Sequence, residues 1–346
     1  MQNLNFTQRP FFFALLFLAL AAGFTACQKD ALIDEAQPTA IENPVVADRS
    51  NNTIVDIAVS NPDFSALVAA VVKTGLVDFL SRSNLNATVF APNNAAFAAL
   101  PAPFNNAQNI GNISDPLQIK TLGQILRYHV SPGAKTAAQL PNGPYKTYKT
   151  SATPNDNWIY VGRNVPGDVY INGVSKVIAA NIQASNGIIH VIDKVLFFPT
   201  QDVAQIAIKN GNFTALVAAL QKTGLVNIFS APTTDATVFA PTDAAFAALP
   251  APLNNAANIR SITDAATINT LRNVLLYHVV GGRVFSVDLR EGISVPTLLS
   301  GKNVNISLIG GPTVKGSGNS AASKIVLTDL LARNGAIHVI DQVLLP

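Results

Sequence analysis

The chain has 346 residues, of which only 12% are charged, and its 23 Lys and Arg nearly balance its 20 Asp and Glu. A net charge of +3 without a long basic run, or a basic stripe interleaved with aromatics, argues against a nucleic-acid partner. At about 100–200 residues per domain, this length predicts two domains, each able to bury a core without disulfides or a metal.

Residues 1–26 have the pattern of a signal peptide. Arg9 supplies a basic start, and Phe11 to Ala22 form an apolar run that is short for a bilayer span. Cys27, the only cysteine of the chain, follows Phe24-Thr25-Ala26. This order resembles a bacterial lipobox, in which cleavage before the cysteine is followed by lipidation of its thiol, although lipoboxes usually carry Leu where Phe24 stands. The alternative is an ordinary secretory signal with an incidental cysteine, but lipidation explains a lone thiol in an oxidising compartment better.

Residues 27–50 are polar, contain Pro38 and Pro44, and show no apolar period, which predicts a flexible tether. Gln28 directly after the cysteine resembles the outer-membrane sorting signal of Gram-negative lipoproteins, and the acidic pair Asp34-Glu35 resembles a surface-export tether. We therefore expect a cell-envelope protein, anchored to the outer membrane of a Gram-negative bacterium rather than spanning it. The sequence leaves periplasmic and surface-exposed orientations open.

Helical patterns come first in the folded part of the chain. Residues 54–59 and 64–74 have helical spacing, and Gly75 stands where a glycine would end the second helix. A short strand over residues 88–90 stops at Pro92, and residues 93–97 and 122–128 are predicted as further helices. From residue 135 onward, β-rich runs alternate with turns at 158–161, 169–173 and 177–179. Helices followed by a meandering antiparallel sheet predict an α+β fold.

A buried strand is predicted over Asn186–Leu196. Asn-Gly favours a type I′ hairpin turn, which needs positive φ at both central residues, and the β-branched run after it carries His190 and Asp193. The same pattern returns at Asn334–Leu344 with His338 and Asp341. A strand pattern that occurs twice in one chain indicates a duplicated domain.

Other motifs repeat at nearly the same spacing. Thr88–Pro92 matches Thr237–Pro241 at an offset of 149 residues (237 − 88), Tyr128-His129 matches Tyr277-His278 at that same offset, and the closing strand follows at 148 (338 − 190). A period of this length is far too long for a solenoid, so the chain is predicted to hold two whole domains, over residues 51–199 and 200–346.

These three motifs, in this order and twice over, resemble a tandem of fasciclin domains. The resemblance covers nearly all of residues 51–346. It implies two domains that are each a wedge-shaped antiparallel β-sandwich with several helices packed on it. It also implies a secreted or anchored adhesion and matrix module, whose contacts centre on the Tyr-His segment and on loops near the closing strand. Carried over to this chain, the candidate binding residues are Tyr128, His129, Tyr277 and His278, with Asp193 and Asp341 as secondary candidates.

All four histidines of the chain, His129, His190, His278 and His338, fall on the repeated motifs. One interpretation is a metal or catalytic pair in each domain. A metal centre needs three or four ligands, however, and an aspartate three residues after a histidine falls on the opposite face of a strand. The favoured interpretation is therefore a hydrogen-bonded structural histidine, with no metal and no cofactor. Nucleophile elbows, phosphate loops and zinc-protease motifs are absent, so we do not expect an enzyme.

The leading hypothesis is a non-catalytic, lipid-anchored adhesion or binding protein that contacts extracellular matrix, polysaccharide or surface proteins. Two domains on one tether add avidity even when each binds weakly. The alternative is a structural or accessory component of an envelope or polysaccharide-uptake complex, without an adhesive ligand of its own. A third hypothesis, an enzyme, requires turnover that is lost in a folded His190→Ala variant.

Overall fold

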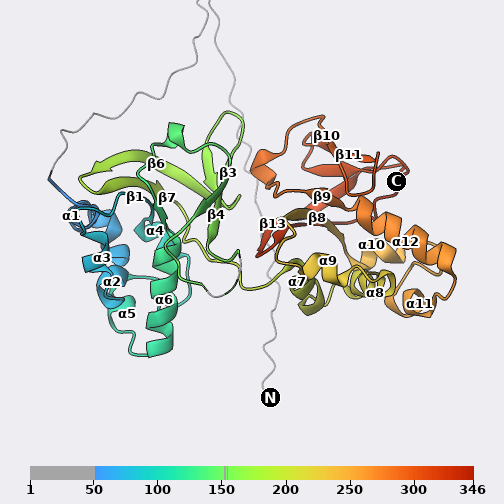
Figure 1. The fold of residues 1–346 in the computed structure, drawn as a ribbon, viewed down its shortest axis with the longest axis horizontal. Helices are drawn as coiled ribbons and strands as arrows, with labels where there is room; N and C mark the ends of the chain where they lie inside the picture. The colour runs from blue at the N-terminus through green and yellow to red at the C-terminus, as the bar shows by residue number, and fades with distance from the viewer. Residues whose placement is uncertain (1–50, 152, 154) are drawn as a thin grey trace, which may run out of the picture. The chain divides into compact units, whose positions relative to one another are not determined.

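Helices and strands alternate in the same order in the two copies of the repeat. The computed structural model describes residues 51–151, 153 and 155–346, which belong to one compact unit (Figure 1). The predicted signal peptide, Cys27 and the tether lie outside the described residues. Within the described part of the chain, no single helix is both long and apolar enough to cross a bilayer, and only the bent pair at residues 54–60 and 62–73 meets that test jointly.

The first copy has six α-helices and seven strands among its described residues. The helices are α1 (Ile54–Ser60), α2 (Ser65–Lys73), α3 (Val77–Leu80), α4 (Asn94–Ala98), α5 (Ala107–Gly111) and α6 (Pro116–Tyr128). The strands are β1 (Ala87–Pro92), β2 (Val130–Pro132), β3 (Gly143–Lys146), β4 (Trp158–Arg163), β5 (Val169–Ile171), β6 (Ser175–Ala184) and β7 (Gly187–Ile192). Short 3₁₀ turns cover Pro62–Phe64 and Ala137–Gln139.

The second copy repeats this plan. Its helices are α7 (Val203–Lys209), α8 (Thr214–Thr223), α9 (Val226–Ser230), α10 (Asp243–Ala247), α11 (Ala256–Ser261) and α12 (Ala265–Tyr277), with a 3₁₀ turn at Ser286–Asp288. Its strands are β8 (Ala236–Pro241), β9 (Val279–Gly281), β10 (Ser294–Pro296), β11 (Asn303–Ser307), β12 (Thr313–Lys315), β13 (Ser323–Ala332) and β14 (Gly335–Ile340).

The local signals explain where the helices begin and end. The side chain of Asn93 accepts a hydrogen bond from the Ala96 amide and caps α4, as Thr242 caps α10. Gly75 follows α2 with φ +66°, a left-handed conformation that glycine adopts without strain. The predicted end of the second helix at Gly75 is confirmed.

Each copy contains one sheet of seven strands, and the sheet is mixed rather than wholly antiparallel. The strand order is β2-β1-β7-β6-β5-β4-β3 in the first copy and β10-β11-β12-β13-β14-β8-β9 in the second. The α+β class is confirmed, but the closing strand lies parallel to the first strand, with His190 beside Phe90 and His338 beside Phe239. Parallel pairing requires a long crossover, and the helices and the meander between β1 and β7 supply it.

The paired strands β1 and β7 of the first copy are buried on both faces. Successive side chains of a strand point to opposite faces, so Val89 and Ile189 pack into the core formed with the helices. Phe90 and Ile192 pack into a second core with the meander strands. Figure 1 shows helices α1 to α6 gathered on one side of the strands of this copy. The closing strand therefore lies between the two hydrophobic cores of its domain.

The Asn-Gly hairpin was predicted correctly, but for the wrong reason. Ala184 pairs with Gly187, so the loop between β6 and β7 is Ser185-Asn186, and neither Asn186 nor Gly187 has a positive φ. The Asn186 side chain instead accepts from the Ile54 amide at 2.9 Å and donates to the Leu80 carbonyl at 2.7 Å. The buried Asn186 side chain thus links the hairpin to the helices through hydrogen bonds. The corresponding bonds of Asn334, to Val203 and Phe229, repeat this arrangement.

Gly187 is required for a steric reason. A Cβ atom at this position would lie 2.3 Å from the carbonyl oxygen of Ala87, its register partner on the parallel strand β1. A Cβ atom at Gly335 would lie at the same distance from the carbonyl oxygen of Ala236. The parallel pairing, which is a tertiary feature, explains why glycine opens the closing strand.

Candidate functional site

The Tyr-His motif lies at the end of α6 and is buried. The Tyr128 hydroxyl donates to the Trp158 carbonyl at 2.7 Å and accepts from the side-chain nitrogen (Nδ2) of Asn172 at 3.2 Å. Burial raises the pKa of Tyr128. Nε2 of His129 accepts from the Leu196 amide at 2.9 Å, so Nδ1 carries the proton that is donated to the Ile125 carbonyl at 2.7 Å. Burial lowers the pKa of His129 to about 4, so the ring is neutral near pH 7.

His190 makes a second, separate set of backbone contacts. Its Nδ1 accepts from the Asn181 amide at 3.2 Å, and its Nε2 donates to the Lys135 carbonyl at 2.9 Å. The imidazole also stacks on Phe90, with ring centroids 5.7 Å apart. Burial lowers the pKa of His190 as well. Both ring nitrogens are therefore used inside the domain.

The second copy repeats these contacts. Tyr277 donates to the Asn303 carbonyl at 2.6 Å. His278 accepts from the Leu344 amide at 2.8 Å, with its pKa lowered to about 4 by burial. His338 lies between the Asp329 amide at 3.3 Å and the Val284 carbonyl at 2.9 Å.

Asp193 and Asp341 lie just beyond the closing strands. Oδ1 of Asp193 accepts from the Lys176 amide at 2.7 Å, and Oδ1 of Asp341 accepts from the Lys324 amide at 2.8 Å. Each carboxylate thus holds the end of a strand to its antiparallel neighbour. Among the residues that the structure describes, no three His, Cys, Asp or Glu side chains come together in a way that could hold a metal ion.

The structure thus places the Tyr hydroxyls, the His ring nitrogens and one carboxylate oxygen of each Asp in contacts within the chain. Residues that border open space are further candidates for contacting a ligand. An open cleft of about 560 Å³ offers such residues, and it is bordered by Pro144, Asn155, Trp158, Tyr160, Pro232, Thr233, Thr234, Asp235 and Arg283.

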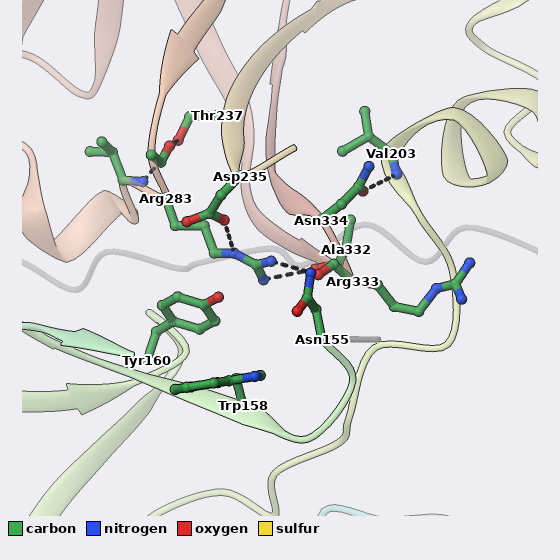
Figure 2. A network of polar contacts seen from close by, with 12 residues as sticks. Asn155, Trp158, Tyr160, Val203, Asp235, Thr237, Arg283, Ala332, Arg333 and Asn334 are labelled. Carbon is green, nitrogen blue, oxygen red and sulfur yellow. Dashed lines mark hydrogen bonds and ion pairs between the residues drawn. The ribbon is translucent and has the colours of Figure 1, made fainter. Parts of the chain in front are cut away.

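Arg283 is held rigidly at the back of this cleft. Its Nε donates to Asp235 at 2.7 Å, and its two terminal nitrogens donate to the Ala332 and Arg333 carbonyls at 2.8 and 2.7 Å (Figure 2). The guanidinium carbon lies 4.3 Å from the ring centroid of Tyr160, a cation–π distance. Charge-assisted bonds to three acceptors leave Arg283 little freedom.

Two aromatic rings from one strand face the cleft beside Arg283. Trp158 and Tyr160 are two residues apart on β4, so they lie on the same face of the sheet, and Figure 2 shows both rings below the guanidinium. Both side chains are half-buried, whereas the Asp235 side chain is 50% exposed. Asn155 donates to the Pro232 carbonyl and ties the two rims of the cleft together.

Sequence reasoning missed this cleft. Its aromatic residues, its carboxylate and its arginine come from positions 158–160, 235 and 283, and no spacing rule links them. The one available signal was Trp158, the only tryptophan of the chain, on a strand rich in aromatics.

Comparison with known proteins identifies the class that this fold represents. The Fasciclin domain profile matches residues 62–199 and 211–346, so the chain belongs to the fasciclin domain family. Fasciclin domains typically serve in cell adhesion and extracellular-matrix binding rather than in catalysis, and the predicted family and fold class are confirmed.

Several relatives share parts of the chain. Protein sll1483 of Synechocystis sp. is 38% identical over 169 residues, which are 49% of this chain and 86% of that protein. The pig transforming growth factor-beta-induced protein ig-h3 is 30% identical over 259 residues, 75% of this chain and 34% of that protein. The fasciclin-like arabinogalactan protein of Arthroderma benhamiae is 32% identical over 177 residues, 51% of this chain and 37% of that protein. The chain thus spans about a third of the length of the latter two.

A solved structure of a FAS1 domain pair from the insect cell adhesion molecule Fasciclin I also matches. It covers 83% of this chain and 98% of its own, with 18% identity and a TM-score of 0.38.

Proposed function

We propose that this protein is a non-catalytic binding module of the cell envelope, anchored by a lipid on Cys27, that holds polysaccharide in the cleft at Trp158. The observation that carries the proposal is the contrast between the two sets of candidate residues. The Tyr hydroxyls and His ring nitrogens of the repeated motifs are used inside the domains, whereas Trp158, Tyr160 and Asp235 border open space.

The cleft has the chemistry that a sugar ring requires. Aromatic faces pack against the apolar C–H faces of a sugar, and a half-exposed carboxylate accepts hydrogen bonds from its hydroxyls. Arg283 orients the Asp235 carboxylate through a 2.7 Å ion pair and also lies over Tyr160. A site whose groups are already held in place loses little entropy when it binds.

We expect Trp158→Ala to weaken polysaccharide binding at least tenfold, about 1.4 kcal/mol, because the substitution removes the larger of the two aromatic side chains that border the cleft. A glycan array would first identify the ligand, and isothermal titration would then compare the variant with wild type. Phe197→Ala is the matched control, since Phe197 is an aromatic that is 53% exposed and does not border the cleft.

Equal losses in both variants would contradict a role for the cleft. A wild-type protein that binds no glycan, but co-purifies with neighbouring envelope proteins, would favour the accessory role instead.

We also expect Cys27→Ser to release the mature protein from the membrane fraction. Its thiol is the only one in the chain that a lipid could occupy, and the apolar run before it has signal-peptide length. Mass spectrometry of the wild-type N-terminus should find acyl chains on Cys27. A wild-type protein without acyl chains, equally distributed with the variant, would remove the anchor from the proposal and leave the cleft unaffected.

A further inference from the structure

The helices of the first copy enclose an apolar cavity that the proposed function does not use. The cavity has a volume of about 150 Å³ and lies between helices α1, α2 and α3 and strand β1. Its lining runs from Phe64, which is 1% exposed, to Val59 and Val72, which are 63% and 62% exposed. The lining of the cavity therefore includes both core residues and residues at the surface of the domain.

The cavity offers no free polar group. His129 is the only lining residue with a polar side chain, and its two ring nitrogens are already bonded to Ile125 and Leu196 at 2.7 and 2.9 Å. Water is poorly held in such a space, because a buried water needs two to four polar partners. A polar ligand would lose its hydrogen bonds to solvent without replacement.

The second copy shows that the fold does not require this hollow. The corresponding space there measures about 20 Å³. Among the residues that line this space, Leu220 stands at the position of Val71 and Phe229 at the position of Leu80, and both are larger than their counterparts. Val203 is smaller than its counterpart Ile54, but the space is small all the same. At the rim of the first cavity, Val59 and Val72 correspond to Ile208 and Gln221. An unfilled cavity lowers the stability of a domain. The first copy nevertheless has a cavity of this size, whereas the second copy does not.

We propose that this cavity is a binding site for a compact, uncharged apolar molecule of about the size of one aromatic ring. The size follows from the volume, since a cavity of about 150 Å³ lined by Leu, Ile and Phe in another protein holds benzene. The apolar character follows from the lining, whose only polar side chain is fully engaged. The site is separate from the cleft at Trp158, because the two share no lining residue.

Benzene is the probe for the test, with phenol as the polar control. In the full-length protein, benzene is expected to shift the methyl resonances of Leu67, Val71 and Ile189 and to raise the melting temperature. Phenol at the same concentration is expected to bind at least tenfold more weakly, because the cavity cannot satisfy its hydroxyl. Unchanged resonances with benzene, or equal binding of both compounds, would overturn the proposal.

The repeat supplies the matched variants. The double variant Val71→Leu with Leu80→Phe copies the packing of the second domain, so benzene binding should disappear and the melting temperature of the free protein should rise by about 2–4 °C. The reverse variant, Leu220→Val with Phe229→Leu, should create a second benzene site in the other domain. If the variant with Val71→Leu and Leu80→Phe fails to fold, the reverse variant still tests the proposal. Benzene binding that persists in the filled variant, or fails to appear in the opened one, would contradict the assignment.

Discussion

The variant Gly187→Ala is expected to destabilise the first domain by at least about 3 kcal/mol, at the upper end of overpacking costs. The new Cβ would lie 2.3 Å from the carbonyl oxygen of Ala87, and this atom belongs to the backbone of a strand that is buried on both faces. A flexible side chain could move aside, but this carbonyl cannot do so without breaking the parallel ladder of β1 and β7. Urea unfolding followed by the fluorescence of Trp158 measures the effect, because the only tryptophan lies in this domain.

The control for this experiment is Gly111→Ala, which lies in the same domain at the end of α5. A Cβ at Gly111 would have no neighbour within 4 Å, and its φ lies outside the left-handed region. We expect this variant not to destabilise the domain, because alanine adopts this conformation without strain. If the two alanine variants were equally stable, the close parallel approach at Gly187 would be wrong.

Acidification from pH 7 to pH 5 is expected to destabilise the protein by roughly 2 kcal/mol for each of His129 and His278. Burial lowers the pKa of both groups to about 4, whereas a histidine of the unfolded chain titrates near 6.5. Between these values the unfolded state binds more protons than the folded state, so stability falls as the pH falls below 6.5. The loss levels off below about 4, where both states are protonated. His190 and His338 add to the effect, because burial lowers their pKa as well.

The variant His129→Gln separates this titration from other causes. It should be less stable than wild type at pH 7, because it loses the bond to the Leu196 amide, but its stability should fall less between pH 7 and pH 5. The aspartates with lowered pKa, such as Asp264, do not interfere, because their contribution is lost only below pH 3.8. A wild-type stability that stays flat across this range would contradict a buried neutral imidazole.

Much of the fold could be predicted because its signals are local. The helix over residues 93–97, the glycine that ends the second helix and the helix over residues 122–128 each depend on neighbours within about one helical turn, and the structure confirms all three. The duplication was equally readable, since the motifs return at a constant offset, and the fasciclin family follows from them. The antiparallel meander was also expected from its alternating runs and turns.

Strand pairing between residues that are far apart in the sequence could not be predicted. Ala87 and Gly187 are register partners of a parallel ladder, although about a hundred residues separate them, so the sequence pattern alone pointed to a wholly antiparallel sheet. The same pairing, rather than a type I′ turn, explains the Asn-Gly step. The histidines are hydrogen-bonded inside the domains, and their backbone partners became visible only in three dimensions.

The sequence by itself determined that this protein is a duplicated fasciclin-type chain with capped helices, a closing strand and no local motif of catalysis. Only the tertiary structure reveals the cleft and the cavity in which we propose that ligands bind. The cleft joins residues of β4 to Asp235 and Arg283, and the cavity of the first copy is larger than the corresponding space of the second. Helix caps and periodicity act between near neighbours, whereas the shape of a cleft or cavity results from packing among segments that are remote in the chain.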